Sequence, residues 1–140
     1  MTAKTPVDML SEVDLFTVLT KAEVKKIHDA GKEVSFNAGR TIVSEGETGV
    51  GFHMILDGKA KVTVNGRLRG TLGPGDYFGE MAIIDRGPRS ATVTAETNVT
   101  TLGIASWDFM PVLSANFEMC RKIMVELSRR LRGAEKSLTH

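Results

Sequence analysis

GFHMILDGKAKVTVNGRLRGTL, the stretch from residue 51 to residue 72, decides the fold class of this chain. It contains three short runs rich in apolar and β-branched residues, at 52–56, 60–64 and 68–72. Asp57-Gly58 and Asn65-Gly66 separate the runs, and such pairs favour tight type I′ turns because Asn, Asp and Gly tolerate positive φ angles. The stretch therefore predicts two β-hairpins.

Similar runs lie on both sides of this stretch, at 34–36, 41–43, 91–95 and 99–104. Most of the 14 glycines fall between or beside the runs. Closely spaced strands joined by tight turns are typical of an antiparallel sandwich or barrel. We therefore predict an antiparallel β-roll, jelly-roll-like and similar to the double-stranded barrel of cupins.

The segment before the strands has a helical pattern. Apolar residues recur at mostly three- or four-residue steps over residues 7–28. Thr20 interrupts this pattern, and its hydroxyl can cap a second helical piece. We therefore expect N-terminal helices with a break near Thr20.

The segment after the strands predicts two further helices. Ser106 and Asn116 are the expected N-caps of these helices. Pro111 should make the first helix short or irregular, because proline lacks an N–H and clashes with the carbonyl four residues back. The second helix should bury one stripe, formed by Cys120, Ile123, Met124, Leu127 and Leu131. A sheet between helical ends makes this an α+β arrangement, and we expect a single domain over residues 1–140.

Composition excludes several classes of function. The formal net charge is +1, which gives no field to attract DNA or an anionic bilayer. The chain has one cysteine, Cys120, too few for a disulfide framework or a cysteine-based metal site. No uncharged run approaches 18 residues, so we expect neither a signal peptide nor a membrane span, and we expect a cytoplasmic protein.

The stretch GPGDYFGEMAIIDRGPRSATV, residues 73–93, does not follow the strand pattern and can form a phosphate site. Glycine lets backbone amides approach an anion, and a short helical piece at 80–84 presents unpaired N–H groups. Arg89 follows Pro88, and its guanidinium can bind two phosphate oxygens at once. Glu80 would repel a phosphate, so its carboxylate fits a hydroxyl of the same ligand, such as a ribose 2′-OH. Phosphate and ribose together indicate a nucleotide.

This stretch resembles the phosphate-binding cassette of the cyclic nucleotide-binding domains found in cAMP receptor transcription factors, protein kinase A regulatory subunits and nucleotide-gated channels. The cassette pattern matches at 78–82 (Phe-Gly-Glu-Met-Ala) and at 88–93 (Pro-Arg-Ser-Ala-Thr-Val). A pattern of many residues at fixed spacing is far more specific than a lone glycine motif. The resemblance covers nearly the whole chain, and five glycines stand at fitting places around it: Gly46, Gly58, Gly66, Gly73 and Gly75.

The resemblance implies a role for each matching residue. Glu80 would bind the ribose 2′-OH and Arg89 the exocyclic phosphate oxygens. Main-chain or hydroxyl contacts to the ligand would come from Gly79, Ala82 and Ser90. The purine would lie beside Val62, Leu72 and Met81. No residue of the last helix matches a fixed base-capping motif, although Arg129 or Arg130 could reach over the ligand.

We therefore predict a cyclic nucleotide sensor that is not an enzyme, with cAMP as its ligand and cGMP as a second candidate. A serine after the arginine, Ser90, favours cAMP in the resembled family without excluding cGMP. The alternatives are an enzyme that hydrolyses or transfers cyclic nucleotides, and a protein-interaction module that keeps the fold without binding nucleotide. A further alternative is that Arg89 and Glu80 form a surface ion pair with each other, without any ligand. A metal site is not expected, since His53 stands alone.

Partners follow from the same patterns. The chain stops at His140, too soon for a helix-turn-helix, so we expect no direct DNA binding. The apolar stripe of the last helix can form a homodimer with a second copy, or it can fold back over the ligand. The sequence does not choose between these two arrangements, and it leaves the effector protein open.

Overall fold

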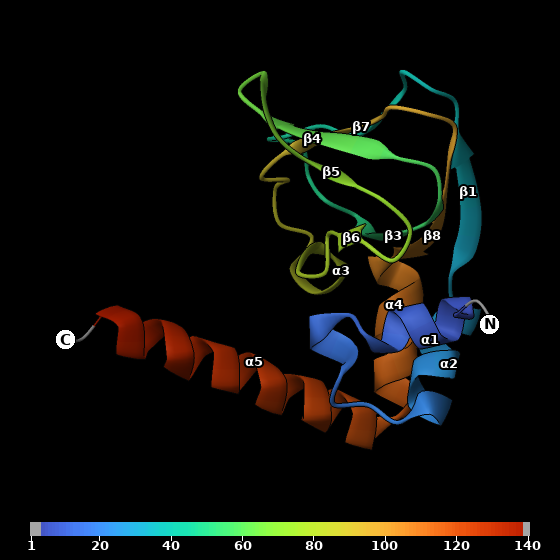
Figure 1. The fold of residues 1–140 in the computed structure, drawn as a ribbon. Helices are drawn as coiled ribbons and strands as arrows, with labels where there is room; N and C mark the ends of the chain where they lie inside the picture. Colours follow the sequence, from blue (N-terminus) through green and yellow to red (C-terminus); the bar gives the residue numbers. More distant parts are fainter. Residues whose placement is uncertain (1–3, 139–140) are drawn as a thin grey trace.

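Two four-stranded antiparallel sheets form a β-roll that rests on a group of helices (Figure 1). The computed structural model describes residues 4–138. The first sheet has the order β1 (Lys32–Phe36), β8 (Val99–Ala105), β3 (Gly51–Asp57) and β6 (Tyr77–Phe78). The second has the order β2 (Thr41–Val43), β7 (Thr92–Ala95), β4 (Ala60–Val64) and β5 (Arg67–Leu72). The predicted α+β fold is confirmed, as two sheets and not as a closed barrel.

The helices lie at both ends of the chain and at one point inside the roll. The N-terminal ones are α1 (Pro6–Ser11), the 3₁₀ turn η1 (Asp14–Phe16) and α2 (Lys21–Asp29). The C-terminal ones are α4 (Ser106–Ala115) and α5 (Phe117–Leu138), and the short α3 (Ala82–Asp85) interrupts the strands. In Figure 1, α1, α2 and α4 lie beneath the roll, while α5 runs out to one side. Within residues 4–138, no helix is long and apolar enough to cross a membrane.

Of the two predicted hairpins, one is confirmed and one is wrong. Asn65 and Gly66 have φ angles of 53° and 78°, and they join β4 to its antiparallel partner β5. Gly58 also has a positive φ, of 91°, but β3 and β4 lie in different sheets and do not pair. A Cβ at Gly58 would lie 2.1 Å from the carbonyl oxygen of Asn98, so this glycine is required where the chain crosses between the sheets.

The two faces of strand β3 belong to different cores. Phe52 and Met54 pack in a core shared with the helices, where Phe52 lies 5.9 Å from Phe16 between ring centroids. Ile55 points to the opposite face and packs inside the roll. The first sheet therefore separates a helical core from a roll core.

The break near Thr20 is confirmed, since α2 begins directly after it. The Thr20 hydroxyl accepts a hydrogen bond from the backbone N–H of Glu23 at 3.2 Å. The Glu23 carboxylate in turn accepts from the backbone N–H of Thr20 at 2.8 Å. This reciprocal pair is a capping box, which satisfies two backbone donors at the helix start.

Three details of the C-terminal helices differ from expectation. Ser106 is the first residue of α4 and not its cap, because Ala105 precedes the helix without a side-chain hydrogen bond. Asn116 directly precedes α5, but its side chain does not cap that helix. Its amide instead donates to the carbonyl of Val112 in α4, at 2.7 Å. Pro111 lies inside an uninterrupted ten-residue helix, where burial of Phe109 and Leu113 compensates for one missing hydrogen bond.

The buried face of α5 also differs from the predicted stripe. Of the five expected residues only Ile123 is fully buried, and Met124 and Leu131 are 51% and 61% exposed. The other buried positions are Met119 and, unexpectedly for a charged residue, Glu126. The face of α5 that packs against η1 and α4 is therefore rotated about the helix axis away from the predicted apolar stripe.

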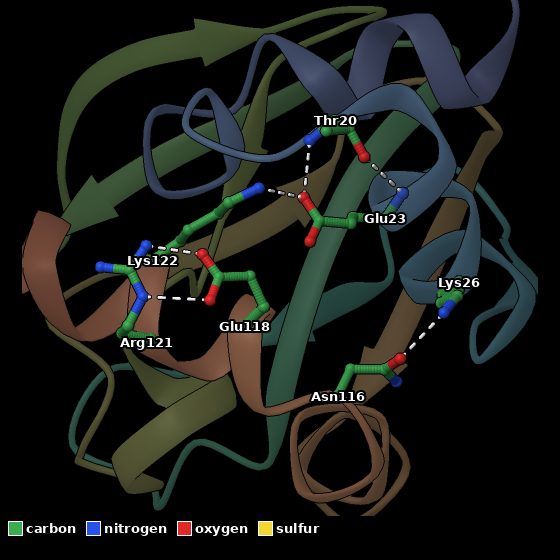
Figure 2. A network of polar contacts seen from close by, with 7 residues as sticks. All are labelled: Thr20, Glu23, Lys26, Asn116, Glu118, Arg121 and Lys122. Atoms are coloured by element: carbon green, nitrogen blue, oxygen red, sulfur yellow. Dashed lines mark hydrogen bonds and ion pairs between the residues drawn. The ribbon is translucent and has the colours of Figure 1, made fainter.

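A polar network joins the start of α5 to α2 (Figure 2). The ammonium of Lys122 donates to the Glu23 carboxylate at 2.8 Å, and both side chains are largely buried. Lys26 donates to the Asn116 side-chain oxygen at 2.8 Å. These contacts anchor the base of α5 to the N-terminal helices.

Candidate functional site

A cavity of about 540 Å³ lies between the inner face of the second sheet and the segment from β6 to β7. All eight sequence-predicted ligand residues line it: Val62, Leu72, Gly79, Glu80, Met81, Ala82, Arg89 and Ser90. Eight further residues complete the wall: Val43, Tyr77, Phe78, Asp85, Gly87, Pro88, Ala91 and Val93. The structure therefore brings the predicted residues together in one place.

A tight turn carries the chain from β6 into the helical piece of the site. Gly79 has a φ of 84°, and a Cβ there would lie 2.4 Å from the carbonyl oxygen of Gly51. Its own carbonyl accepts the hydrogen bond of the Ile83 N–H at 3.2 Å. The turn ends at Arg86, whose left-handed φ of 54° stops the helix after Asp85. The backbone N–H groups at the start of this piece have no acceptor within the helix.

Arg89 is held beside the cavity by backbone and not by a carboxylate. Its guanidinium donates to the carbonyl oxygen of Gly51 at 2.8 Å. The chain around it is fixed by two backbone hydrogen bonds, from the Arg89 N–H to Glu47 and from the Gly46 N–H to Arg89, both 2.8 Å long. Burial lowers the pKa of Arg89 from its ordinary value. Among residues 4–138, no ion pair includes this cation, so its charge is available to an anion.

Two glycines that the sequence analysis did not single out surround this arginine. A Cβ at Gly49 would lie 2.7 Å from the Cβ of Ala82 and 3.1 Å from the Nε of Arg89. Gly51 supplies the carbonyl acceptor, and a Cβ there would lie 2.2 Å from the carbonyl oxygen of Ile104. Only their close spacing on either side of Val50 could have indicated a crowded backbone from the sequence.

Glu80 contacts the last helix and not Arg89, so the interpretation of these two residues as a surface ion pair is wrong. One carboxylate oxygen of Glu80, Oε1, lies 3.5 Å from Nη1 of Arg130 on α5. The other oxygen, Oε2, is buried and has no hydrogen-bond partner, and Nη2 of Arg130 is in the same state. A buried polar atom without a partner is rare in proteins, so these two atoms distinguish the Glu80–Arg130 contact from the other ion pairs.

Arg129 and Arg130, the two suggested base-capping residues, differ in their contacts. Arg129 is exposed and pairs with Glu126 on its own helix at 2.6 Å. Arg130 reaches Glu80 at the rim of the cavity. No residue of α5 lines the cavity in the part of the chain that the structure describes, so neither arginine covers it.

A neutral histidine and a cation–π contact lie near the cavity. Burial and the nearby Arg89 guanidinium lower the pKa of His53 to about 4, so the ring is uncharged at neutral pH. The guanidinium of Arg86 lies 5.9 Å from the ring centroid of Trp107, which joins the turn after α3 to the start of α4. Within residues 4–138, no three His, Cys, Asp or Glu side chains are grouped as a metal site requires.

The geometry defines what the cavity can bind. Arg89 supplies a positive charge, Glu80 a carboxylate with one unpaired oxygen, and apolar side chains of the second sheet form much of the remaining wall. A ligand with an anionic group, a hydroxyl and a flat apolar part matches all three features.

The comparisons with known proteins show the family of this chain. Residues 33–116 match the model of the cyclic nucleotide-binding domain, and the chain belongs to this family. It is 38% identical over 119 residues to a cGMP-dependent protein kinase of Toxoplasma gondii, and 41% identical over 101 residues to a cAMP-dependent protein kinase regulatory subunit of Schizosaccharomyces pombe. These matches cover 84% and 71% of this chain, but 12% and 24% of the two relatives.

A similar solved structure is the N-terminal domain of a transcriptional regulator from Streptomyces coelicolor. It superposes with a TM-score of 0.85 at 28% identity, covering 95% of this chain and 96% of that one. The chain therefore corresponds to one module of its longer relatives, and it is a cyclic nucleotide-binding domain of the type found in kinase regulatory subunits and catabolite activators.

Proposed function

We propose that this chain is a non-catalytic sensor module that binds cAMP in preference to cGMP. The observation that carries the proposal is the pair of unused polar groups on one cavity: the Arg89 guanidinium without a carboxylate and the buried Oε2 of Glu80 without a partner. In this proposal Arg89 binds the exocyclic phosphate oxygens, and Oε2 accepts a hydrogen bond from the ribose 2′-OH.

The remaining wall accounts for the rest of the nucleotide. Val62, Leu72 and Met81 offer apolar contact to the purine, and Met81 is 45% exposed at the rim. Gly79, Ala82 and Ser90 provide main-chain or hydroxyl contacts beside the phosphate. We assign no covalent step to the cavity, because its acidic groups are Glu80 and Asp85, and Asp85 already accepts from the Gly87 N–H at 2.8 Å.

The contact between Arg130 and Glu80 can couple ligand binding to the position of α5. A ligand hydroxyl at Glu80 changes the partner set of that carboxylate, and therefore the energy of the Arg130 contact on α5. A ligand shifts a conformational equilibrium by its difference in affinity for the two states. We infer that filling the cavity changes the pose of α5, which an effector protein then detects.

We further propose that α5 forms a homodimer. Phe117, Met124 and Leu131 follow one another at seven-residue spacing and are 71%, 51% and 61% exposed. Cys120 and Leu127 stand between them at the other apolar heptad positions, where they are half-buried against the helical core of their own chain. Such an apolar seam on an exposed helix fits a second copy of the same helix in a coiled coil.

Isothermal titration calorimetry with cAMP, cGMP and 2′-deoxy-cAMP tests the ligand assignment. We expect cAMP to bind about tenfold more tightly than cGMP, because a difference of one hydrogen bond between the two purines is worth about 1–1.5 kcal/mol. Loss of the 2′-OH should weaken binding by about five- to 100-fold. Tighter binding of cGMP would reverse the preference, recovery of AMP after incubation would show catalysis, and no binding would favour the interaction module.

The same titration on Ser90→Ala separates two roles of the hydroxyl. If Ser90 reads the guanine edge, the variant loses more affinity for cGMP than for cAMP. If Ser90 serves only the phosphate, the two losses are equal.

A further inference from the structure

Glu126 on α5 is a charged residue whose side chain is buried, which is unfavourable for a charge. Its side chain is 2% exposed, although residues on both sides of it, Val125 and Arg129, are exposed. Removing a carboxylate from water is costly unless hydrogen bonds and opposite charges replace the solvent. The contacts of Glu126 therefore indicate what its charge does.

Two arginines surround this carboxylate. Arg129 donates to both oxygens of Glu126, at 2.8 and 2.6 Å. The Nε of Arg130 lies 3.5 Å from Oε2 of Glu126. The hydrogen bond from Arg129, together with Arg130, lowers the pKa of Glu126, so the group is a carboxylate at neutral pH.

The same helix contains a matched pair without the burial. Glu118 and Arg121 have the same three-residue spacing as Glu126 and Arg129, and Arg121 donates to both oxygens of Glu118. Glu118 is 58% exposed, however, and has no second arginine beside it. The two glutamates thus differ in burial and in the contact of Glu126 with Arg130.

Arg130 lies between two carboxylates. Its guanidinium is 3.5 Å from Glu126 through Nε and 3.5 Å from Glu80 through Nη1. A guanidinium in a fork arrangement can bind both oxygens of one carboxylate. Here it engages only one oxygen of Glu80, which leaves the buried Oε2 without a partner on a residue that lines the cavity.

We propose that Glu126 is a positioning residue for ribose recognition, because it holds Arg130 so that one oxygen of Glu80 stays free for the ligand. Without the negative charge of Glu126, Arg130 turns to Glu80 as its remaining partner and competes with the 2′-OH for Oε2. The inference rests on the proposed binding of a cyclic nucleotide. It adds that affinity for the ribose is set from α5, by a residue that does not touch the ligand.

The test is calorimetry of Glu126→Gln with cAMP and with 2′-deoxy-cAMP, with Glu118→Gln as the matched control. Gln keeps the size of the side chain and removes only the charge. We expect Glu126→Gln to weaken cAMP binding about three- to tenfold, in the range of coupling between contacting residues, and to weaken 2′-deoxy-cAMP less than twofold. Glu118→Gln should leave both affinities unchanged.

The ribose dependence separates positioning from a general structural role. Equal losses for the two ligands, or no loss for either, would overturn the proposal while the parent still binds cAMP. Failure of the parent to bind either ligand would overturn the proposed function, and this inference with it. If circular dichroism shows that Glu126→Gln is unfolded, Glu126→Asp is the deciding variant. Its shorter side chain withdraws the negative charge from Arg130, so it must show the same ribose-dependent loss of affinity.

Discussion

Arg89 is unusual among the charged residues of this chain, because it is half-buried and its side-chain contact is a neutral carbonyl. A cation removed from water without a counter-charge is unfavourable in the free protein. A bound phosphate would supply that counter-charge. Under the proposed function, the free energy of ligand binding should therefore depend strongly on this one residue.

We predict that Arg89→Ala lowers affinity for cAMP by at least tenfold, at a loss of about 2–4 kcal/mol, because it removes a charge-assisted phosphate contact. Arg86→Ala is the control, since Arg86 belongs to the same segment, is exposed and does not line the cavity. Calorimetry measures both variants. Unchanged affinity in Arg89→Ala would place the phosphate elsewhere.

The sequence predicted those site residues that stand together in one motif. Glu80 and Arg89 stand in a pattern of fixed spacing, and the structure places both on one cavity. The role of Gly51 was not predictable, because it depends on a carbonyl from β3 meeting a side chain that lies 38 residues later. Glu126 was missed for a similar reason, since its burial depends on how α5 is rotated against the rest of the molecule.

At the scale of elements, turns were predictable where local backbone conformation decides the outcome. Asn65-Gly66 gives a hairpin because two positive φ angles are needed between neighbouring strands. Asp57-Gly58 carries the same signal, but β3 pairs with β8, so long-range pairing overrides the turn. The helix through Pro111 is a third case, in which burial of the flanking residues outweighs a local preference.

The contact between α2 and α5 leads to a prediction about stability (Figure 2). Glu23→Gln keeps an acceptor for the capping box but removes the ion pair with Lys122, whose two side chains are 16% and 24% exposed. We expect the free energy of unfolding to fall by about 1 kcal/mol, between the values for exposed and fully buried pairs. Urea denaturation measures the change.

Glu118→Gln again serves as the control, because the Glu118–Arg121 pair is exposed and should contribute little. The Glu23 pair is shielded from solvent, so the difference between Glu23→Gln and the parent should persist at high salt. An equal loss of stability in Glu118→Gln and Glu23→Gln would contradict the prediction, because the shielded ion pair between α2 and α5 would then contribute no more than an exposed one.

At the scale of the whole molecule, the exposed seam of α5 predicts self-association. Sedimentation equilibrium should find the parent as a dimer at tens of micromolar, and the double variant Met124→Glu/Leu131→Glu as a monomer, because like charges would face each other across the seam. Val125→Glu is the matched control, since Val125 is 55% exposed but lies outside the heptad positions. A monomeric parent would contradict the prediction.

The first sheet places the roll core and the helical core on its opposite sides, and β3 contributes side chains to both. Substitutions among the buried residues of one core therefore need not disturb packing in the other. Over evolutionary time, the residues of the helical core can therefore change while the interior of the roll keeps its packing. A lineage of such modules would then retain the roll and vary the helical layer around it.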